Sequence, residues 1–549
     1  MTQERESEQR IWMAVALSVA VWLGWTTLFP SPKPTEPPPA DVAAATATAP
    51  PTSTGETTSA PPPVATTIEV PDRTVPLQDP DYSGVVRSKD GALSSTMLAR
   101  YHRAWHVTPF WNFAIDKVLG RGTEHWEPYV RDESLAQVLG ADASYVTAGT
   151  GRPGPDGGYL VEANGSAVTA TRTLANGLTI TKRYAPGGEG NKVDVAVELT
   201  NGSAAALDGV WVGVAETFVA PTGRYANQMT PVLLADGDIE KISDPEHAGE
   251  SYDGPVDWFG YGDRYFLAVL APKDLDAGAH GEIQTLPDGR VGSFVVDPRP
   301  LQPAETRSLH FLGYLGPKDL RLLEPLGSDL DEAVEFGFWG FFAKILLSAL
   351  KFFERWVGNW GIAIIVLTVI VKTLFYPLTS MQYQSSKKMQ ALKPKLDAIK
   401  EQYKDNAQLQ SQETMKLFQQ EKVNPTMGCL LPIVQIPVWF ALYSVLLNSV
   451  ELYDSSFLYL RDLTQVDPYG VFPTIAAVLM IVLQRMMPMT GLDPTQQKII
   501  QAMPFVFAFL MYTFPSGLAV YISVNNTLSV AQQWYMNRRF KTIESPALA

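Results

Sequence analysis

The order of apolar and polar positions divides the chain into an N-terminal apolar run, a middle part with alternating positions and a C-terminal part with several apolar runs. The first run, from Ile11 to Phe29, has 19 residues and no charge, close to the ~20 that a helix needs to cross a membrane. It is either a signal peptide or a retained anchor. No small-x-small cleavage motif follows it directly, which favours a transmembrane anchor over residues 1–29.

A proline-rich linker and a β domain are predicted to follow the anchor. Residues 30–66 hold 11 prolines among Ala and Thr, a composition that cannot bury enough apolar surface to offset the entropy of ordering. Residues 67–328 show a period of two: every second position from Val193 to Leu199 is apolar, and the segments 168–174 and 178–184 flank an Asn-Gly turn. Many such segments predict a large antiparallel β-sandwich.

An amphipathic helix is predicted over residues 329–356. Lys344, Ser348 and Lys351 recur at i, i+4 and i+7 and therefore line one face, while phenylalanines, leucines and Trp339 cover the rest. This pattern is typical of a helix that lies in the membrane surface, and a membrane crossing is the competing interpretation.

Five further apolar runs are candidate transmembrane helices. They cover residues 360–378, 427–450, 469–483, 499–514 and 517–534. The runs that begin at 469 and 499 are short for an upright span. Together with the anchor they predict a polytopic α-helical membrane protein of six spans, five of which form the core bundle. Span 2 is assigned to 357–380 and spans 3 to 6 to 426–536.

The charges between the runs predict an orientation. Residues 380–426 hold eight lysines and five acids, whereas 451–468 hold four acids and only Arg461. The positive-inside rule places the first loop in the cytoplasm and the second outside. If the amphipathic helix lies flat, both termini are cytoplasmic, including a short basic tail at 537–549. The β domain is then periplasmic, and the protein resides in a bacterial inner membrane.

The lysine-rich loop, residues 381–425, is predicted to form a cytoplasmic helical hairpin. Leu392, Leu396 and Ile399 recur at helical spacing in its first half. One interpretation is a surface that serves a partner. The plainer interpretation is a solvated connection between two spans with no further task.

Composition excludes several classes of protein. Residues 1–340 carry 25 Lys+Arg and 45 Asp+Glu, and the remaining residues carry 18 and 12. Such an acidic larger half argues against nucleic acid as a partner. The single cysteine, Cys429, excludes a disulfide framework and a multi-cysteine metal site. None of the six histidines belongs to an H-E-x-x-H motif, which argues against a zinc hydrolase. No cofactor and no metal are therefore predicted.

Lys372 is the residue that is hardest to explain as structural. It lies inside the 360–378 run, where an ionisable group needs water or a partner. The competing interpretation is snorkelling, since Pro377 at the inner end is only ~7 Å away along a helix. Thr368 and Thr379 share its helix face. Polar side chains in the other runs are Gln435, Asn525, Ser529 and Gln532, the last three at i, i+4 and i+7. Polar faces of this kind meet around water, because in lipid they lack partners.

An enzyme is not predicted. The apolar runs contain neither a nucleophile with a base nor a pair of carboxylates, so an intramembrane protease is excluded. A proton-coupled transporter usually needs a buried acid or histidine, and the runs contain none. In the β domain, Asp257, Asp263 and Arg264 lie near aromatic residues, and we interpret them as solvated strand edges. Lys372 thus has no carboxylate within the apolar runs to pair with. An unpaired cation is suited to attract an acidic group of another chain.

The chain resembles the YidC membrane-protein insertases of Gram-negative bacteria over nearly its whole length. The order and spacing of several short motifs carry the resemblance. These motifs are Gly358-Asn359-Trp360-Gly361, Tyr376-Pro377-Leu378-Thr379, Glu421-Lys422-Val423-Asn424-Pro425, Gly428-Cys429, Gln435-Ile436-Pro437, Asp493-Pro494, Gln496-Gln497-Lys498 and Phe514-Pro515-Ser516-Gly517-Leu518.

The resemblance implies a hydrophilic groove that opens to the cytoplasm and to lipid and carries one cation, here Lys372. Its implied lining is Thr368, Gln435, Tyr521, Asn525, Ser529 and Gln532. An apolar slide for the substrate is implied at Ile436, Pro437, Trp439, Phe505 and Phe509. The implied partners are nascent integral membrane proteins, the Sec translocon, the lipid bilayer and, through the cytoplasmic loops and only weakly, the ribosome.

Two departures from the family pattern matter. The family's cation is typically arginine, and lysine keeps the charge but lacks the guanidinium fork that binds a carboxylate with two parallel hydrogen bonds. The tail after Trp534 is short and only modestly basic. Two rival functions stay open: a structural assembly scaffold in which Lys372 merely snorkels, and a channel or transporter, which requires a continuous pore.

Overall fold

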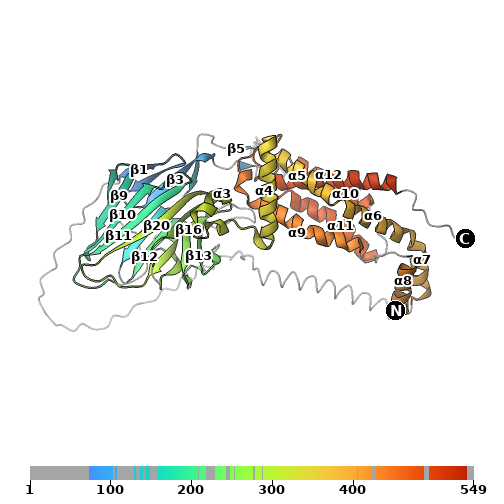
Figure 1. The fold of residues 1–549 in the computed structure, drawn as a ribbon, viewed down its shortest axis with the longest axis horizontal. Coiled ribbons are helices and arrows are strands. Elements are labelled where there is room, and N and C mark those ends of the chain that lie inside the picture. Colours follow the sequence, from blue (N-terminus) through green and yellow to red (C-terminus); the bar gives the residue numbers. More distant parts are fainter. Residues whose placement is uncertain are drawn as a thin grey trace, which may run out of the picture.

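The chain forms a β domain that is joined to a set of long helices (Figure 1). This computed structural model describes residues 73–540 except for 103–105, 108–128, 131–135, 140–141, 149–157, 208, 218–228, 243–247, 253, 276–277, 287–288, 405, 422–426 and 487–493. The predicted anchor and linker, residues 1–66, lie outside the described residues. So do the last nine residues of the predicted tail, 541–549.

Two nine-stranded sheets make up the β domain, and their strands pair antiparallel. The first sheet holds β1 (Thr74–Gln78), β2 (Tyr82–Arg87), β3 (Leu93–His102), β6 (Ala136–Leu139), β7 (Asp142–Ala148), β12 (Val210–Thr217), β15 (Glu250–Tyr252), β18 (His280–Thr285) and β19 (Arg290–Asp297). The second holds β8 (Leu160–Asn164), β9 (Ala167–Thr173), β10 (Leu178–Pro186), β11 (Lys192–Asn201), β13 (Thr230–Ala235), β14 (Asp238–Lys241), β16 (Val256–Gly262), β17 (Phe266–Pro272) and β20 (Thr306–Pro317). A separate two-stranded ladder joins β4 (His106–Val107) to β5 (Tyr129–Val130).

The hairpin and the strand predicted from alternation are confirmed. Strands β9 and β10 pair across a tight turn in which Gly177 has φ +87° and donates its N–H to the Leu174 carbonyl at 3.0 Å. Glycine adopts this left-handed conformation without the steric cost that a Cβ imposes. Strand β11 buries its valines and Leu199 while Asp194 and Glu198 face outward. The alternation therefore marked the face that packs into the core.

The core of the sandwich lies between the two sheets. Leu93 and Val212 of the first sheet and Ile180, Val195 and Val197 of the second belong to one buried cluster, each at most 2% exposed. Burial of apolar side chains stabilises such a core by roughly 1.5–3 kcal/mol for each large residue. The predicted antiparallel β-sandwich is therefore confirmed.

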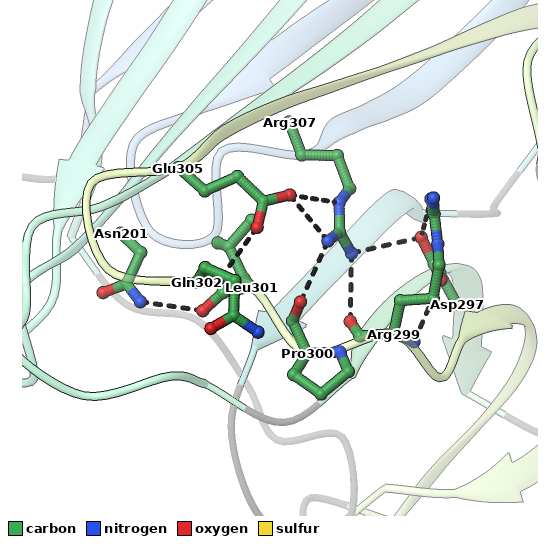
Figure 2. Close-up of polar contacts among 8 residues, drawn as sticks. All are labelled: Asn201, Asp297, Arg299, Pro300, Leu301, Gln302, Glu305 and Arg307. Atoms are coloured by element: carbon green, nitrogen blue, oxygen red, sulfur yellow. Dashed lines mark hydrogen bonds and ion pairs between the residues drawn. The ribbon is translucent and has the colours of Figure 1, made fainter.

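Arg307 stabilises the loop between β19 and β20 (Figure 2). Its guanidinium donates to the carboxylates of Asp297 at 3.2 Å and Glu305 at 2.7 Å, and to the carbonyl oxygens of Arg299 at 3.0 Å and Pro300 at 3.1 Å. Since β20 leads from this loop towards the helices, the network lies at the end of the β domain away from them.

The C-terminal part is helical. The helices are α3 (Leu320–Leu323), α4 (Gly340–Val357), α5 (Trp360–Leu374), α6 (Tyr376–Ala391), α7 (Lys393–Gln402), α8 (Ala407–Gln420), α9 (Met427–Asn448), α10 (Val471–Met486), α11 (Pro494–Met511) and α12 (Ser516–Arg539), with short 3₁₀ segments η2 (Glu324–Leu326), η3 (Leu330–Ala333), η4 (Gly337–Trp339) and η5 (Val450–Leu452). Each predicted apolar run is thus helical. By length and composition, no single helix among the described residues qualifies as a membrane span, whereas α5 and α6 qualify together across a 56° bend.

The bend corrects the expectation of a straight helix over 360–378. Helix α5 ends at Leu374 and α6 begins at Tyr376. Pro377 has no N–H to donate to the carbonyl four residues earlier, and its ring clashes with that carbonyl. Thr379 consequently lies beyond the bend and does not share a straight face with Lys372.

Helix α4 runs across the long helices, between them and the β domain (Figure 1). Its buried face, Ala343, Leu347 and Leu350, packs into a core cluster shared with the bundle. Its two lysines do not face solvent alone: Lys344 pairs with Asp331 at 3.4 Å, and Lys351 binds two acidic residues of the neighbouring segments. The polar face of α4 is therefore partly an internal contact surface.

The β domain and the helices share buried contacts. The Tyr265 hydroxyl donates to the Leu447 carbonyl of α9 at 3.1 Å, and its ring lies 5.5 Å from that of Tyr453, which is buried in the sandwich core. The preceding Asp263 accepts the backbone N–H groups of Tyr265 and Phe266 at 2.7 and 2.6 Å in the turn between β16 and β17. Both are interior strands. The interpretation of Asp263 as a solvated strand edge is therefore wrong, because the turn is inserted at this junction.

The lysine-rich loop forms helices at the end of the bundle away from the β domain (Figure 1). Leu392, Leu396 and Leu417 form a small core between α7 and α8. Lys395 and Glu421 pair at 2.6 Å across the hairpin. The predicted helical hairpin is confirmed in these elements.

Candidate functional site

Helix α5 carries Lys372 deep into the bundle. Asn359 caps the start of the helix: its side-chain oxygen accepts the N–H of Ile362 at 3.1 Å, and its amide donates to the Ser456 carbonyl at 2.9 Å. Lys372 follows Trp360 by twelve residues, about 18 Å along the helix. Its ammonium donates to the Ser529 hydroxyl at 2.7 Å. Among the described residues this is its hydrogen-bond partner, and no ion pair joins it to them.

Helix α12 supplies the partner at the same depth. It begins at Ser516, next to the loop that also receives Asn359, since the N–H of Gly517 donates to the Leu463 carbonyl at 2.9 Å. Ser529 lies thirteen residues on, about 20 Å. Its hydroxyl donates to the Asn525 carbonyl at 2.7 Å and is thereby fixed as an acceptor for the lysine. Two parallel helices with nearby starting points thus bring Lys372 and Ser529 together.

The polar residues of α12 divide between two faces. Ser523, Asn526 and Gln533 are buried, and their side chains donate to the backbone carbonyls of Phe472, Ala476 and Met486 on α10, at 2.8, 3.1 and 3.5 Å. These bonds hold α12 against α10. The other polar face contains Asn525, Ser529 and Gln532, which are half-buried. The sequence alone indicated only the second set, and the bonds to α10 show that the first set has a packing role.

Thr368 and Tyr521 lie closer to the N-terminal ends of the two helices than Lys372 and Ser529. Thr368 is 2% exposed, and its hydroxyl donates to the Ile364 carbonyl of its own helix at 2.6 Å. Tyr521 is 5% exposed and belongs to the buried apolar cluster of the bundle. Both side chains therefore contribute to packing in this structure. Gln435 is half-buried on α9.

The residues assigned to the apolar slide are largely exposed. On α9, Ile436 and Trp439 are 44% and 36% exposed, and Pro437 is half-buried; on α11, Phe505 and Phe509 are 66% and 76% exposed. Trp439 stacks on Tyr443 with ring centroids 6.2 Å apart. Large apolar side chains on an outer surface mark contact with a membrane or with an apolar partner.

Comparison with known proteins gives matches over both parts of the chain. Residues 155–349 match the family described as YidC periplasmic domain, and residues 352–543 match the family described as 60Kd inner membrane protein. The membrane protein insertase YidC of Geobacter metallireducens is 34% identical over 553 residues, which cover 98% of this chain and 100% of the relative. That of Geobacter sulfurreducens is 35% identical over 558 residues, with 98% and 100% covered.

Among solved structures, an active YidC insertase with its first transmembrane domain resolved aligns with a TM-score of 0.34 and 19% identity, covering 84% of this chain and 92% of that chain. The full-length matches to the two Geobacter relatives decide the family. Sequence identity is above 30% along the β domain and the helices together. This chain belongs to the YidC family of membrane protein insertases.

Proposed function

We propose that this chain inserts and folds integral membrane proteins in the bacterial inner membrane, with Lys372 as the charge that receives the polar tail of the substrate. The observation that carries the proposal is that the Lys372 ammonium has one hydrogen-bond partner and no ion pair among the described residues. Its ammonium is held deep between α5 and α12 by one neutral hydroxyl, 2.7 Å away. A buried cation is usually paired with an anion. A buried cation that has no anion beside it among the described residues is suited to bind an anionic group of the substrate transiently.

The electrostatic gain would fall on the most expensive step of insertion. A carboxylate at the centre of a helix in a membrane costs about 2.5–3.5 kcal/mol by insertion scales. A cation and the polar side chains of α12, Asn525, Ser529 and Gln532, would offset part of this cost while the tail passes. Thr368, Tyr521 and Gln435 would complete the walls of the groove. The tail needs no nucleotide, since the membrane potential also acts on its charge.

The apolar segment of the substrate would leave the groove along the exposed side chains of α9 and α11. Its transfer to lipid is favourable in proportion to the apolar area removed from water. Ile436 and Trp439 on α9 and Phe505 and Phe509 on α11 are the exposed apolar side chains that this transfer would use, with Pro437 beside the first two. The protein would lower a barrier, and the substrate's own hydrophobicity would provide the driving force.

The proposed topology has six spans, with both termini in the cytoplasm and the β domain in the periplasm. Helix α4, with exposed Phe341, Phe352 and Trp356, would lie at the periplasmic surface of the inner membrane, since aromatic side chains favour the membrane–water interface. The hairpin of α7 and α8 would receive nascent chains in the cytoplasm. The proposed partners are the Sec translocon in the bilayer and, weakly, the ribosome at the cytoplasmic loops.

The test is insertion by the purified full chain in liposomes. The substrate is a single-span protein with an acidic tail, scored by protection of the tail from added protease. Wild type and Lys372→Arg should insert it, and Lys372→Ala should not. Lys344→Ala is the matched control, because it removes a half-exposed lysine of α4 outside the bundle. Equal insertion by all four would reduce Lys372 to a snorkelling side chain, and no insertion above empty liposomes would favour a scaffold.

A further inference from the structure

Side chains join helix α6 to the last turn of α12. The Tyr383 hydroxyl donates to the side-chain oxygen of Asn537, and the Tyr383 ring lies 5.9 Å from the ring of Phe540. Tyr383 is 5% exposed. A buried tyrosine hydroxyl usually finds a hydrogen-bond partner, and here a helix 154 residues further along the chain provides it. These three residues, Tyr383, Asn537 and Phe540, form a latch between the two helices.

A second contact supports the latch. Tyr376 precedes Tyr383 by seven residues, which is about two helical turns, so both residues lie on one face of α6. The Arg539 guanidinium lies beside the Tyr376 hydroxyl. One face of α6 thus contacts the last turn of α12 at two positions.

The latch lies beyond the contact between Lys372 and Ser529, towards the C-terminal ends of both segments. Asn537 follows Ser529 by eight residues, about 12 Å along α12. Tyr383 follows Lys372 by eleven residues, across the 56° bend between α5 and α6. The bend turns α6 away from the line of α5, and the latch joins it to α12 beyond that point.

In the proposed topology this end of the two segments faces the cytoplasm, from which the substrate arrives. A tail that moves along α12 from this end meets the latch before it reaches Lys372. We propose that the latch is an autoinhibitory contact, which closes the cytoplasmic approach to Lys372 and has to open before a substrate tail enters. This inference rests on the proposed function and adds a conformational step to it.

The chemistry of the latch allows it to open without an energy source. It consists of one hydrogen bond between neutral groups and one pair of aromatic rings, and each shifts an equilibrium by roughly three- to tenfold. Together they favour the closed form by roughly ten- to a hundredfold, which leaves about 1–10% of the molecules open.

The first test measures access to α12 behind the latch, with the full chain in liposomes. Ser529→Cys in a Cys429→Ser background provides a single thiol, because Cys429 is the only cysteine of the chain. A membrane-impermeant maleimide is added to the face that carries the lysine-rich loop. Asn537→Ala removes the acceptor of the latch, and the labelling rate should rise roughly three- to tenfold over that of the parent.

Two further variants separate the latch from a general loosening of α12. Asn537→Asp keeps an oxygen that accepts from the Tyr383 hydroxyl, so its labelling rate should not exceed that of the parent. Arg538→Ala is the matched control one position along, because the Arg538 guanidinium stacks 3.8 Å from the Trp534 ring of its own helix. Its labelling rate should equal that of the parent.

The second test holds the latch closed reversibly. Lys387→Cys and Phe540→Cys, in the same Cys429→Ser background, are joined by a bis-methanethiosulfonate that dithiothreitol cleaves. Both positions flank Tyr383, since the Lys387 ammonium and the Phe540 ring each lie 5.9 Å from its ring. Insertion of the acidic-tail substrate should fall to the level of empty liposomes and return after cleavage. Lys387→Cys alone, treated in the same way, should insert throughout.

The outcomes separate this inference from the function on which it rests. An unchanged labelling rate in Asn537→Ala would overturn the inference, whatever the cross-link does. Full insertion by the cross-linked protein would overturn it as well, because the tail would then reach Lys372 by another route. Failure of the wild type to insert would overturn the proposed function and, with it, this inference, even if labelling shows that the contact opens.

Discussion

Arg307 and Lys372 are two largely buried cations that the protein treats in opposite ways. The side chain of Arg307, 11% exposed, contacts two carboxylates and two carbonyl oxygens in the β domain (Figure 2). Lys372, between the helices of the bundle, makes one hydrogen bond to the part of the chain that the structure describes, to the Ser529 hydroxyl. The first cation is saturated and holds a loop in place. The second, the ammonium of Lys372, keeps N–H donors that can bind another group.

The difference follows from what each region has to do. The β domain must stay folded, and a buried charge there stabilises only if its partners surround it. In the proposed function the bundle admits another chain, and a groove with a saturated cation would offer that chain nothing. We therefore expect substitutions at the two positions to separate stability from activity, and graded cases between them to test how far the rule extends.

The largest effect is expected for Lys372→Met. Insertion of an acidic-tail substrate should fall to the level of empty liposomes, because the charge that offsets the desolvation of the tail is gone. The temperature at which the helical circular dichroism signal is lost in detergent should be unchanged or higher, since no ion pair is broken. A clear drop in that temperature would instead place Lys372 among the structural cations and erase the comparison.

Arg307→Met should show the reverse. It removes the partner that Asp297 and Glu305 share, and although Asp297 keeps its ion pair with Arg299, the loss of these charged hydrogen bonds costs about 1.5–3 kcal/mol. The loss should appear in the strand signal during thermal unfolding of the full chain, while insertion per folded molecule stays at the wild-type value. Lys273→Met is the control, because its ion pair with Asp194 is about half exposed and worth at most ~1 kcal/mol.

Lys351→Met is an intermediate case at the junction of the two regions. Lys351 contacts Asp319 at 3.3 Å and Glu451 at 2.5 Å, and both carboxylates are nearly buried. We expect a loss of about 2 kcal/mol and separate unfolding of the β domain and the helices in calorimetry. A single transition at the wild-type temperature would show that apolar contacts alone hold the junction.

The same substitution should change the acid sensitivity of the junction. Burial alone would raise the pKa of Asp319, but the Arg321 guanidinium and Lys351 outweigh it, and the pKa lies below its usual value. A lowered acid pKa adds stability above the unfolded value of about 3.9, and that stability disappears as the pH falls through the folded value. Lys351→Met should therefore flatten the loss of stability in this acidic range, measured by thermal melts from pH 5 to 2.

The smallest effect is expected at Asp462, in the loop between α9 and α10. Burial raises the pKa of this carboxyl to about 6. Since the folded state holds the proton more tightly, stability falls as the pH rises from about 4 to 6, and the penalty is complete above 6. Asp462→Asn keeps an oxygen for the N–H and hydroxyl of Thr464 and should stabilise the chain by about 1 kcal/mol at pH 7.5. Equal stabilisation at pH 4 would rule out an ionised Asp462 as the cause.

Local patterns predicted the elements well. The alternation from Val193 to Leu199 became the interior strand β11, and the Asn-Gly pair became the turn between β9 and β10. The sequence also contains the cause of the bend after Leu374, which is Pro377, although hydropathy alone indicated one straight helix. Each of these features depends on neighbours within a few residues, which is why a single sequence is enough to predict them.

The roles of the charged residues were harder to predict. Lys351 was interpreted as part of a polar face towards water, and the structure places it between Asp319 and Glu451, which lie 32 residues before it and 100 after it. Asp263 was interpreted as exposed, and it caps a turn at the junction. A charge near an aromatic residue has the same local appearance in both settings.

The sequence by itself therefore determined the β domain, the helices, the unusual placement of one lysine and the family to which these motifs point, because periodicity and motif spacing are local properties. Only the tertiary structure decided that Lys372 contacts Ser529, 157 residues away, and that Gln533 is satisfied by α10 while the adjacent Gln532 is not. Adjacent residues on a helix point about 100° apart, so whether each side chain finds a partner depends on which neighbouring helix it faces.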